Sequence, residues 1–297
     1  MALHQNIVQE AAAASTAAVR VKRTRRLFRN RQLWVGGIIV GVVVFVAIFA
    51  PLVSPYGPNA NDYTNLLQAP SAHHWFGTDQ LGRDQLARTM IGARTSMEVS
   101  IGALVVGLVV GIPVGLVTGY YRGFLDDWLI MRIIDAIQAF PFLILALVLA
   151  AMLGPGARNA MIAIGIGYVP IFVRTVRGQV LAEFEKEYVM AARALGSTDF
   201  RIMWKHILPN SMTPLLVQAT LAMASGIVAE ASLSYLGLGV QPPTASWGTM
   251  LQNSQGYLGQ APWLAIVPGL AIAVSVLGFN VLGDGIQQWL DPRQGNR

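Results

Sequence analysis

The distribution of charged residues is the feature that most limits how this chain can fold. No Asp, Glu, Lys or Arg occurs from Ala231 to Gly283, and other long apolar runs precede this one. Only 12% of the 297 residues are charged, whereas an ordinary soluble domain carries about 25%. Apolar runs of this length are typical of helices that cross a bilayer. The sequence therefore predicts an all-α integral membrane protein.

Six segments are apolar enough to span a membrane, which takes roughly 20 residues per helix. They are Leu33–Leu52, Val99–Tyr120, Ile133–Leu153, Ala160–Val176, Pro214–Leu233 and Leu264–Leu282. Pro113 and Pro141 fall inside two of them, and membrane helices tolerate proline because neighbouring groups satisfy the freed carbonyls. Gly111 and Gly115 are four residues apart, a spacing that favours close packing against another helix.

The basic residues predict how the chain is oriented. Seven of the 21 Lys and Arg residues lie between Arg20 and Arg31, directly before the first apolar run. If this end is cytoplasmic, the outer side holds only four basic residues, and cytoplasmic loops are the ones enriched in Lys and Arg. Those four are Arg83, Arg88, Arg94 and Arg158. We therefore expect cytoplasmic N- and C-termini.

Residues 1–32 are then expected to form a basic cytoplasmic tail that touches anionic lipid head groups. This tail explains the net charge of +6 without a nucleic-acid partner. The first apolar run is too long for a cleaved signal peptide, whose apolar core has about 7–15 residues.

A polar stretch, residues 187–210, interrupts the apolar pattern between the fourth and fifth predicted spans. Its sequence is EYVMAARALGSTDFRIMWKHILPN. Good helix formers fill the first part, and Gly196 suits a left-handed helix end. Ser197 or Thr198 can cap a second helix, which Pro209 is expected to stop. The orientation argument places this pair of helices in the cytoplasm.

The first helix of this stretch has several small side chains. Ala191, Ala192 and Gly196 are expected to leave a surface that another protein can approach closely. The alternative is an amphipathic connector that lies on the lipid head groups.

The motif AARALG…ILP in this stretch resembles the EAA loop of the permease subunits of ABC importers. The matching residues are Ala191, Ala192, Gly196, Leu208 and Pro209. The motif departs from the family pattern at Met190, where the family has Glu. Glu187 lies about one helical turn earlier and can offer its carboxylate to the same partner. In that family the loop is the coupling helix, seated in a cleft of a cytoplasmic ATPase.

Three further stretches resemble dipeptide, oligopeptide and nickel permeases. They are HWFGTDQLGRDQLARTMIGARTS, EASLSYLGLGVQPPTASWGTML and GFNVLGDGIQQWLDPR. A basic tail and an additional span before the core resemble the second, DppC/OppC-like permease subunit of these importers. The resemblance runs from about residue 31 to residue 293.

The resemblance implies a type I ABC importer permease fold with six transmembrane helices in the inner membrane of a prokaryote. Residues 33–95 would form the first helix and outer segment typical of the DppC/OppC-like subunit, and residues 96–290 the permease domain. Implied partners are a homologous permease subunit, two ATP-binding subunits and an extracytoplasmic binding protein. Implied cargo is a di- or oligopeptide, with nickel, glutathione or a sugar derivative as alternatives. ATP and magnesium would be bound by the ATPase partners.

The sequence itself argues against an enzyme. A P-loop needs Gly directly before Lys, but the three lysines, Lys22, Lys186 and Lys205, follow Val, Glu and Trp. There is no cysteine, and we expect neither a metal nor another cofactor in this chain. His73 and His74 are expected to be a solvated loop pair. Asp79 and Asp84, beside Arg83, are expected to cap and ion-pair within a loop rather than act as an acid and a base.

Glu230 lies toward the outer end of the fifth predicted span. In an importer it is expected to fix a helix end or to line the outer part of the pathway. In an ion-coupled secondary transporter, the main rival, it would relay protons. That rival predicts pairs of intramembrane charges and inverted repeats. The second, fourth and sixth predicted spans have no central charge, and no internal repeat stands out. A membrane scaffold without transport is a third reading.

Overall fold

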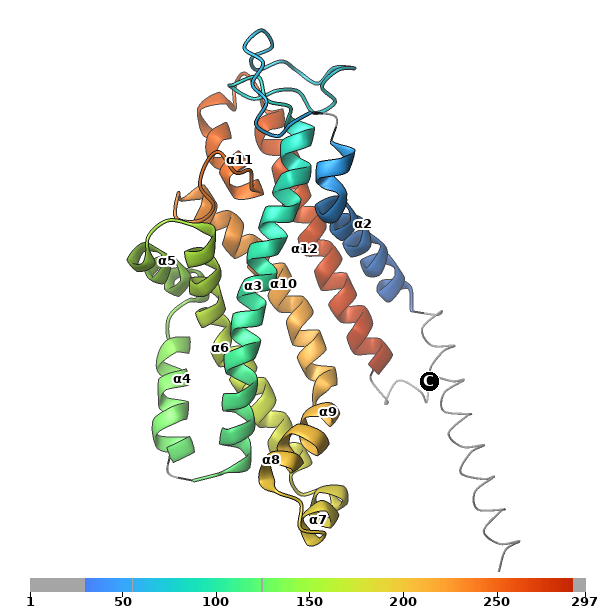
Figure 1. Cartoon of the computed structure of the whole chain (residues 1–297), viewed down its shortest axis with the longest axis vertical. Coiled ribbons are helices and arrows are strands. Elements are labelled where there is room, and N and C mark those ends of the chain that lie inside the picture. The colour runs from blue at the N-terminus through green and yellow to red at the C-terminus, as the bar shows by residue number, and fades with distance from the viewer. Residues whose placement is uncertain (1–29, 55, 124, 291–297) are drawn as a thin grey trace, which may run out of the picture.

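The computed structural model describes residues 30–54, 56–123 and 125–290. Most of the predicted basic tail, residues 1–29, lies outside the described residues, as do the last two arginines, Arg293 and Arg297. The described part is a bundle of helices with irregular loops gathered at one end and a short projecting hairpin at the other (Figure 1).

Five of the described helices are long and apolar enough to cross a membrane. They are α2 (Arg31–Val53), α3 (Gln85–Tyr120), α6 (Ala157–Glu183), α10 (Met212–Tyr235) and α12 (Trp263–Leu290). Each contains one of the predicted spans, and each begins or ends beyond it. The all-α membrane fold is therefore confirmed.

The third predicted span is not one continuous helix. A π-helical segment, η1 (Leu125–Ile130), leads into α4 (Met131–Gln138), and α5 (Phe142–Leu153) follows after a break. The two arms of this broken span are bent by 92° at the break. Proline disfavours helical backbone at the residue before it. The first arm therefore ends at Gln138, shortly before Pro141, and the chain does not continue as a single kinked helix.

The seam between α3 and α6 is built on glycine. Four glycines, spaced four apart on α3, each face a larger side chain on α6: Gly107, Gly111, Gly115 and Gly119 lie opposite Tyr168, Phe172, Val176 and Val180. A Cβ added to any of these glycines would lie only 2.5–2.7 Å from the Cβ of the facing residue. Such contact brings the two backbones together, which is how membrane helices gain packing energy. The expected close packing of this span is confirmed.

The first and last long helices form a second close seam. A Cβ on Gly36 would lie 2.4 Å from the backbone nitrogen of Leu282, and one on Gly285 would lie 2.5 Å from that of Leu33. The Asn30 amide also donates to the Gly285 carbonyl oxygen at 2.9 Å. Helix α2 is therefore held against α12 along the side of the bundle (Figure 1).

Helix α3 begins 14 residues before the predicted span because its start is polar and capped. Asp84 accepts a hydrogen bond from the Ala87 backbone N–H at 2.8 Å, as an N-cap residue does. Asp79 binds the Arg83 Nε at 2.7 Å. Capping and ion pairing are therefore the roles that this loop gives its two carboxylates, as predicted.

Candidate functional site

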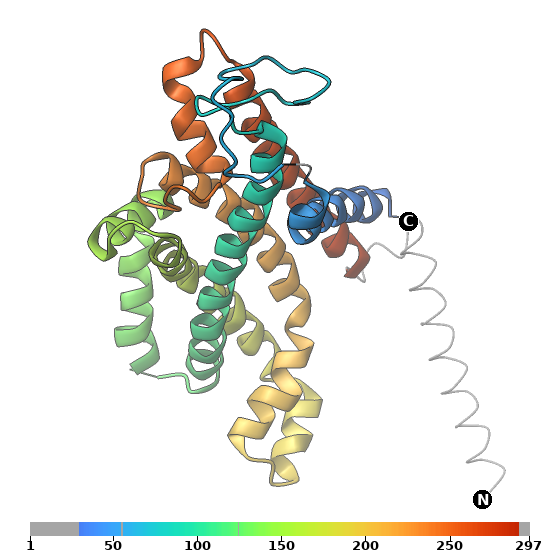
Figure 2. The same ribbon diagram turned by 45° about the horizontal axis from the view of Figure 1, so that its top comes forward.

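The polar stretch forms a hairpin of short helices, here named the polar hairpin and defined as residues 187–210. It contains α7 (Glu187–Ala194), α8 (Asp199–Arg201), the π-helical η2 (Ile202–Ile207) and α9 (Leu208–Asn210). It projects from the end of the bundle opposite the irregular loops, and it remains separate when the view is turned (Figures 1 and 2). The predicted pair of helices is confirmed.

The turn between the two arms depends on Gly196. Its φ of +76° lies in the left-handed region, which glycine adopts without steric cost. The Ser197 N–H donates to the Ala192 carbonyl oxygen at 3.0 Å, which closes the end of α7. Thr198 then accepts from the Arg201 N–H at 3.4 Å. The predicted glycine helix end and the Thr198 cap are both present.

The second arm differs from the prediction because Pro209 does not stop it. Pro209 lies inside α9, which leads through Ser211 into α10. The hydrogen bond from the Leu208 N–H to the Met203 carbonyl oxygen spans five residues, as in a π turn. Proline in a regular helix clashes with the carbonyl four residues earlier. A wide turn just before Pro209 leaves room for its ring, so the chain stays helical.

One face of the polar hairpin is buried against the bundle. Val189, Ile202 and Ile207 are fully buried and belong to the same apolar core as α3 and α6. Ala192 is on this face too, with only 7% of its surface exposed. The expectation that Ala192 contributes to an exposed small-residue surface is therefore wrong, because it faces the chain's own core.

The rest of the hairpin surface is exposed, and large apolar side chains lie there among charged ones such as Arg201 and Lys205. Four large side chains lie on it: Met190, Leu195, Phe200 and Trp204, of which Leu195 is 87% exposed. The predicted contact residues Glu187, Ala191, Gly196 and Pro209 are exposed as well, and Leu208 is partly buried against the core. An exposed apolar patch on an element that projects from the bundle is typical of a protein contact surface.

Sequence reasoning missed Leu195, Phe200 and Trp204 as members of this surface. Their signal was present, because Phe200 and Trp204 are four residues apart and so share a helix face. In the structure their ring centroids are 6.0 Å apart.

Side chains tie the polar hairpin to the ends of the long helices. The Tyr120 and Tyr121 hydroxyls donate to the Asp199 carboxylate at 2.6 and 3.0 Å. These hydrogen bonds, the one from Tyr120 first, lower the pKa of Asp199. The Arg193 guanidinium lies 4.0 Å from the centroid of the Phe184 ring, within range of a cation–π interaction. These contacts therefore attach the hairpin to the ends of α3 and α6.

The elbow between α6 and α7 is held by a buried carboxylate. Glu183 is 7% exposed and accepts hydrogen bonds from Lys186 Nζ and the Tyr188 hydroxyl, both at 2.7 Å. Burial, together with the neighbouring Glu183 carboxylate, raises the pKa of Tyr188 to about 12. The Tyr188 hydroxyl thus stays protonated at physiological pH, and two hydrogen bonds to one carboxylate hold the elbow.

Two adjacent alanines provide a direct test of which hairpin face meets a partner. Ala191 is exposed and Ala192 is buried. We expect Ala191→Asp to leave the abundance and stability of the chain unchanged while weakening ATPase capture. Ala192→Asp buries an unpaired carboxylate, which costs about 2 kcal/mol or more, so its abundance should fall. Membrane abundance and ATPase co-purification of both variants, measured side by side, would contradict this assignment if the two effects were reversed.

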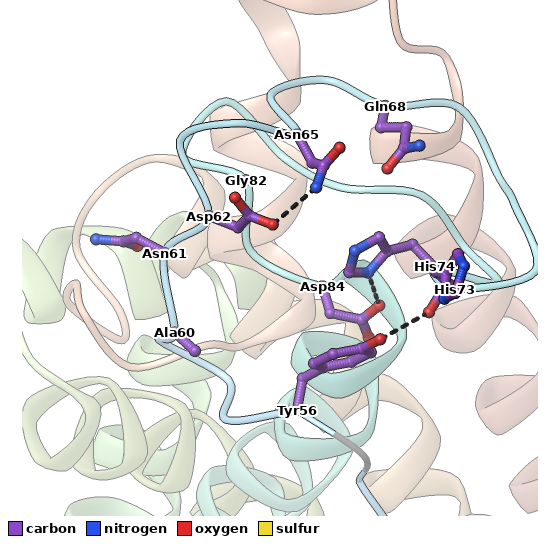
Figure 3. A pocket seen from close by; sticks show the side chains of 10 residues that line it. All are labelled: Tyr56, Ala60, Asn61, Asp62, Asn65, Gln68, His73, His74, Gly82 and Asp84. Atoms are coloured by element: carbon purple, nitrogen blue, oxygen red, sulfur yellow. Dashed lines mark hydrogen bonds and ion pairs between the residues drawn. The ribbon is translucent and has the colours of Figure 1, made fainter.

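The opposite end of the molecule contains a polar pocket of about 320 Å³, lined mainly by amide and carboxyl side chains. Figure 3 shows His74 on its wall, with Nδ1 bonded to Asp84 at 2.8 Å. His74 is only 7% exposed, so the expectation of a solvated histidine pair is wrong for His74. Its neighbour His73 is exposed. No group of three or more metal-ligating side chains occurs among the described residues.

Glu230 is fully buried near the end of α10. Its Oε1 accepts from the Ser234 hydroxyl at 2.7 Å, and the same hydroxyl accepts from the Val240 N–H at 3.0 Å. Glu230 therefore helps to fix the end of a helix against the following loop. The predicted role of Glu230 at a helix end fits this contact, and its role in lining the pathway stays a prediction.

We expect Glu230→Gln to keep transport dependent on ATP, because the amide retains an oxygen that can accept from Ser234. The loss should be no more than that of one hydrogen bond, about 0.5–1.5 kcal/mol. Uptake into proteoliposomes, driven either by ATP or by a pH jump alone, measures this. Uptake by the unmodified chain in a pH jump without ATP, lost in Glu230→Gln, would instead support a proton relay.

The structure is that of a multi-pass membrane protein. It has apolar spanning helices, one broken span and a projecting hairpin with exposed apolar side chains. Comparison with known families agrees. Residues 111–296 match the model of the binding-protein-dependent transport system inner membrane component, and residues 22–70 match the N-terminal transmembrane domain of oligopeptide transport permease C. The chain belongs to the family of inner membrane components of binding-protein-dependent transport systems, the permeases of ABC importers.

Curated relatives are similar over most of the chain. The dipeptide transport system permease protein DppC of Alkalihalophilus pseudofirmus is 45% identical, with 91% of this chain and 88% of the relative covered. The glutathione transport system permease protein GsiD of Shigella flexneri is 44% identical, with 91% and 89% covered. A putative peptide transport system permease of Brucella abortus is 41% identical, with 92% of each covered.

A solved structure shows the same fold. It is a chain of the MetNI methionine ABC transporter in inward-facing conformations, which matches with a TM-score of 0.56 and 21% sequence identity. The match covers 68% of this chain and 95% of that chain.

Proposed function

We propose that this chain is the DppC/OppC-like permease subunit of a peptide importer, and that its polar hairpin is the socket for a partner ATPase. The observation that carries the proposal is the exposed apolar face of the hairpin, centred on Leu195 and Phe200. Exposed apolar patches on a projecting element mark protein contact sites, and the neighbouring Trp204 is of a residue type enriched among the side chains that dominate binding energy in interfaces.

The partners follow from family membership. We infer a heterodimer with a homologous permease, two ATP-binding subunits on the hairpin side, and an extracytoplasmic binding protein on the side of the irregular loops. The chain has no lysine preceded by glycine, so ATP and magnesium are assigned to the ATPase partners. The hairpin and both termini are placed in the cytoplasm, in keeping with the distribution of Lys and Arg.

The proposed mechanism is alternating access. ATP binding moves the ATPase subunits, and the hairpin transmits their movement through Asp199 to Tyr120 and Tyr121 and through Arg193 to Phe184. A ligand shifts a two-state equilibrium only by binding one state better. The rigid elbow at Glu183 makes that bias act on α6, which packs along the whole glycine seam of α3.

Peptides are the proposed cargo because the similar curated proteins include a dipeptide permease. Glutathione, itself a peptide, is the second candidate because another relative is a glutathione permease. A nickel or sugar-derivative cargo has no support from these relatives.

Uptake by the reconstituted system tests the proposal. The chain, its permease partner, the ATPase subunits and the binding protein encoded with it are assembled in proteoliposomes. We expect ATP-dependent accumulation of a labelled dipeptide. Accumulation of glutathione alone would change the cargo and leave the permease assignment intact, and accumulation driven by an ion gradient without ATP would overturn the importer assignment.

The absence of native cysteine allows the orientation to be tested with single-cysteine variants. Leu195→Cys on the hairpin and Trp75→Cys in the outer loops are both highly exposed in the structure. In intact cells whose outer membrane has been made permeable, a membrane-impermeant maleimide is expected to label Trp75→Cys only. Labelling of Leu195→Cys instead would invert the proposed orientation.

A further inference from the structure

A second pocket at the loop end of the molecule is lined by arginines, whereas the pocket in Figure 3 is lined by aspartates. Its volume is about 160 Å³, and it lies between the outer segment and the loop that contains α11 (Trp247–Ser254). The polar residues that line it are Gln80, Arg83, Arg88, Thr244, Thr249 and Asn253.

Two buried arginines in this pocket share a single carboxylate. Arg83 and Arg88 are 7% and 3% exposed, and Asp79 is 4% exposed. The Asp79 Oδ2 lies 2.7 Å from the Arg83 Nε and 3.7 Å from the Arg88 Nε. The other nearby carboxylate, Asp84, is bonded to His74 and caps α3. The arginine cluster therefore has one positive charge more than its carboxylate balances.

The terminal nitrogens of Arg83 are available to bind a further group. The Arg83 side chain uses Nε for Asp79, and its two Nη atoms have no partner among the described residues. Arg88, by contrast, donates from Nη1 to the Pro58 carbonyl and to Asn59 at 3.0 and 3.1 Å. Four of the five N–H donors of the Arg83 guanidinium are therefore available to water or to an acceptor that enters the pocket.

Neutral polar groups complete the pocket. Asn253 makes no side-chain hydrogen bond within the described part of the chain and offers its amide, and Thr244 offers a hydroxyl. The Gln80 Oε1 is buried without a partner, and turning this amide over would present its NH₂ group instead. Several possible donors thus line a space that only a small group can fill.

We propose that this pocket binds a carboxylate group. One unbalanced positive charge matches a monoanion, and the paired N–H groups of a guanidinium suit the two oxygens of a carboxylate. The volume excludes a whole peptide but admits one carboxylate with its first carbon atoms. The pocket in Figure 3 differs from it, because that pocket is lined by Asp62 and Asp84 and by no arginine. This inference does not depend on the cargo.

The test uses trifluoroacetate as a probe and fluorine NMR line broadening as the readout, on the purified complex of this chain with its partner subunits. Thr244→Glu places a tethered carboxylate at the pocket, and Thr244→Gln is its neutral control of equal size. Thr244 is exposed, so both variants should fold, and gel filtration checks this. We expect Thr244→Glu to lose at least about tenfold in probe affinity and Thr244→Gln to keep it.

Equal broadening in the unmodified complex and both variants would overturn the proposal, as would no broadening in the unmodified complex. Asn253→Ala provides a second test, since it removes a donor without adding charge, and it should weaken the probe severalfold. If the Asn253→Ala variant and the Thr244→Glu variant both bound the probe as tightly as the unmodified complex, the proposed site would be refuted.

Two sources of carboxylate are separated by competition with the probe. Displacement by alanyl-alanine, but not by its C-terminal amide, would assign the site to the carboxyl end of a peptide. Displacement by the partner binding protein, and not by either dipeptide, would assign it to an Asp or Glu side chain of that protein. Either result supports a carboxylate site.

Discussion

Leu195→Asp is expected to abolish ATP-driven uptake while leaving the membrane abundance of the chain unchanged. Leu195 is 87% exposed at the tip of the polar hairpin, so the change costs the isolated chain little. In the proposed complex it places a charge in an apolar contact. Burying a carboxylate without a partner in such a contact costs at least about 2–4 kcal/mol, which corresponds to a loss of ATPase affinity of about 30- to 800-fold.

Leu195→Met is the matched control, because it keeps the size and apolar character of the side chain and should transport normally. ATPase subunits that co-purify with each variant are quantified along with uptake. If Leu195→Asp held its ATPase subunits and transported at the normal rate, the hairpin tip would not be the docking surface.

Gly115→Leu is expected to prevent accumulation of the folded chain. A single Cβ at this position would lie 2.6 Å from the Val176 Cβ and 2.8 Å from the Val173 carbonyl oxygen. The leucine must therefore push α3 and α6 apart along a seam with three more glycines. Overpacking a core typically lowers stability by about 1–3 kcal/mol and occasionally more. Because this leucine must displace backbone, we expect a loss at the upper end of that range.

The control for this substitution is Gly41→Leu on α2. Gly41 is exposed, and an added Cβ there would meet nothing within 4 Å. Both variants add the same side chain to a glycine in an apolar helix, so only packing differs. Membrane abundance and the melting temperature in detergent should fall for Gly115→Leu alone. A similar fall for both would mean that leucine is harmful for a reason other than the seam.

The long helices were predictable because hydrophobicity is averaged over many residues. The break of the third span could not be predicted, because a proline interrupts one helix and is tolerated inside another. Pro113 lies inside the continuous α3, whereas Pro141 separates α4 from α5 by a 92° bend. The outcome depends on whether tertiary neighbours, such as the Phe142 ring stacked 5.0 Å from that of Tyr168, favour the bent form.

The hairpin was predictable as two helices, because Gly196 and Thr198 act through local backbone geometry. It was harder to predict which residues of the hairpin face outward. Ala191 and Ala192 are alike in sequence, and only the position of the bundle makes one exposed and the other buried. The burial of His74 and Glu230 likewise depends on contacts between distant segments, such as Ser96 of α3 with Trp247 of α11, which no local pattern encodes.

The most direct test of the account is a crosslink from the hairpin tip. A photoactivatable amino acid is placed at position 195 in native membranes, with position 75 in the outer loops as the control, and the crosslinked proteins are identified by mass spectrometry. The account predicts that position 195 crosslinks to a P-loop ATPase subunit and position 75 does not. A crosslink from position 195 only to lipid, or from position 75 to the ATPase, would contradict it.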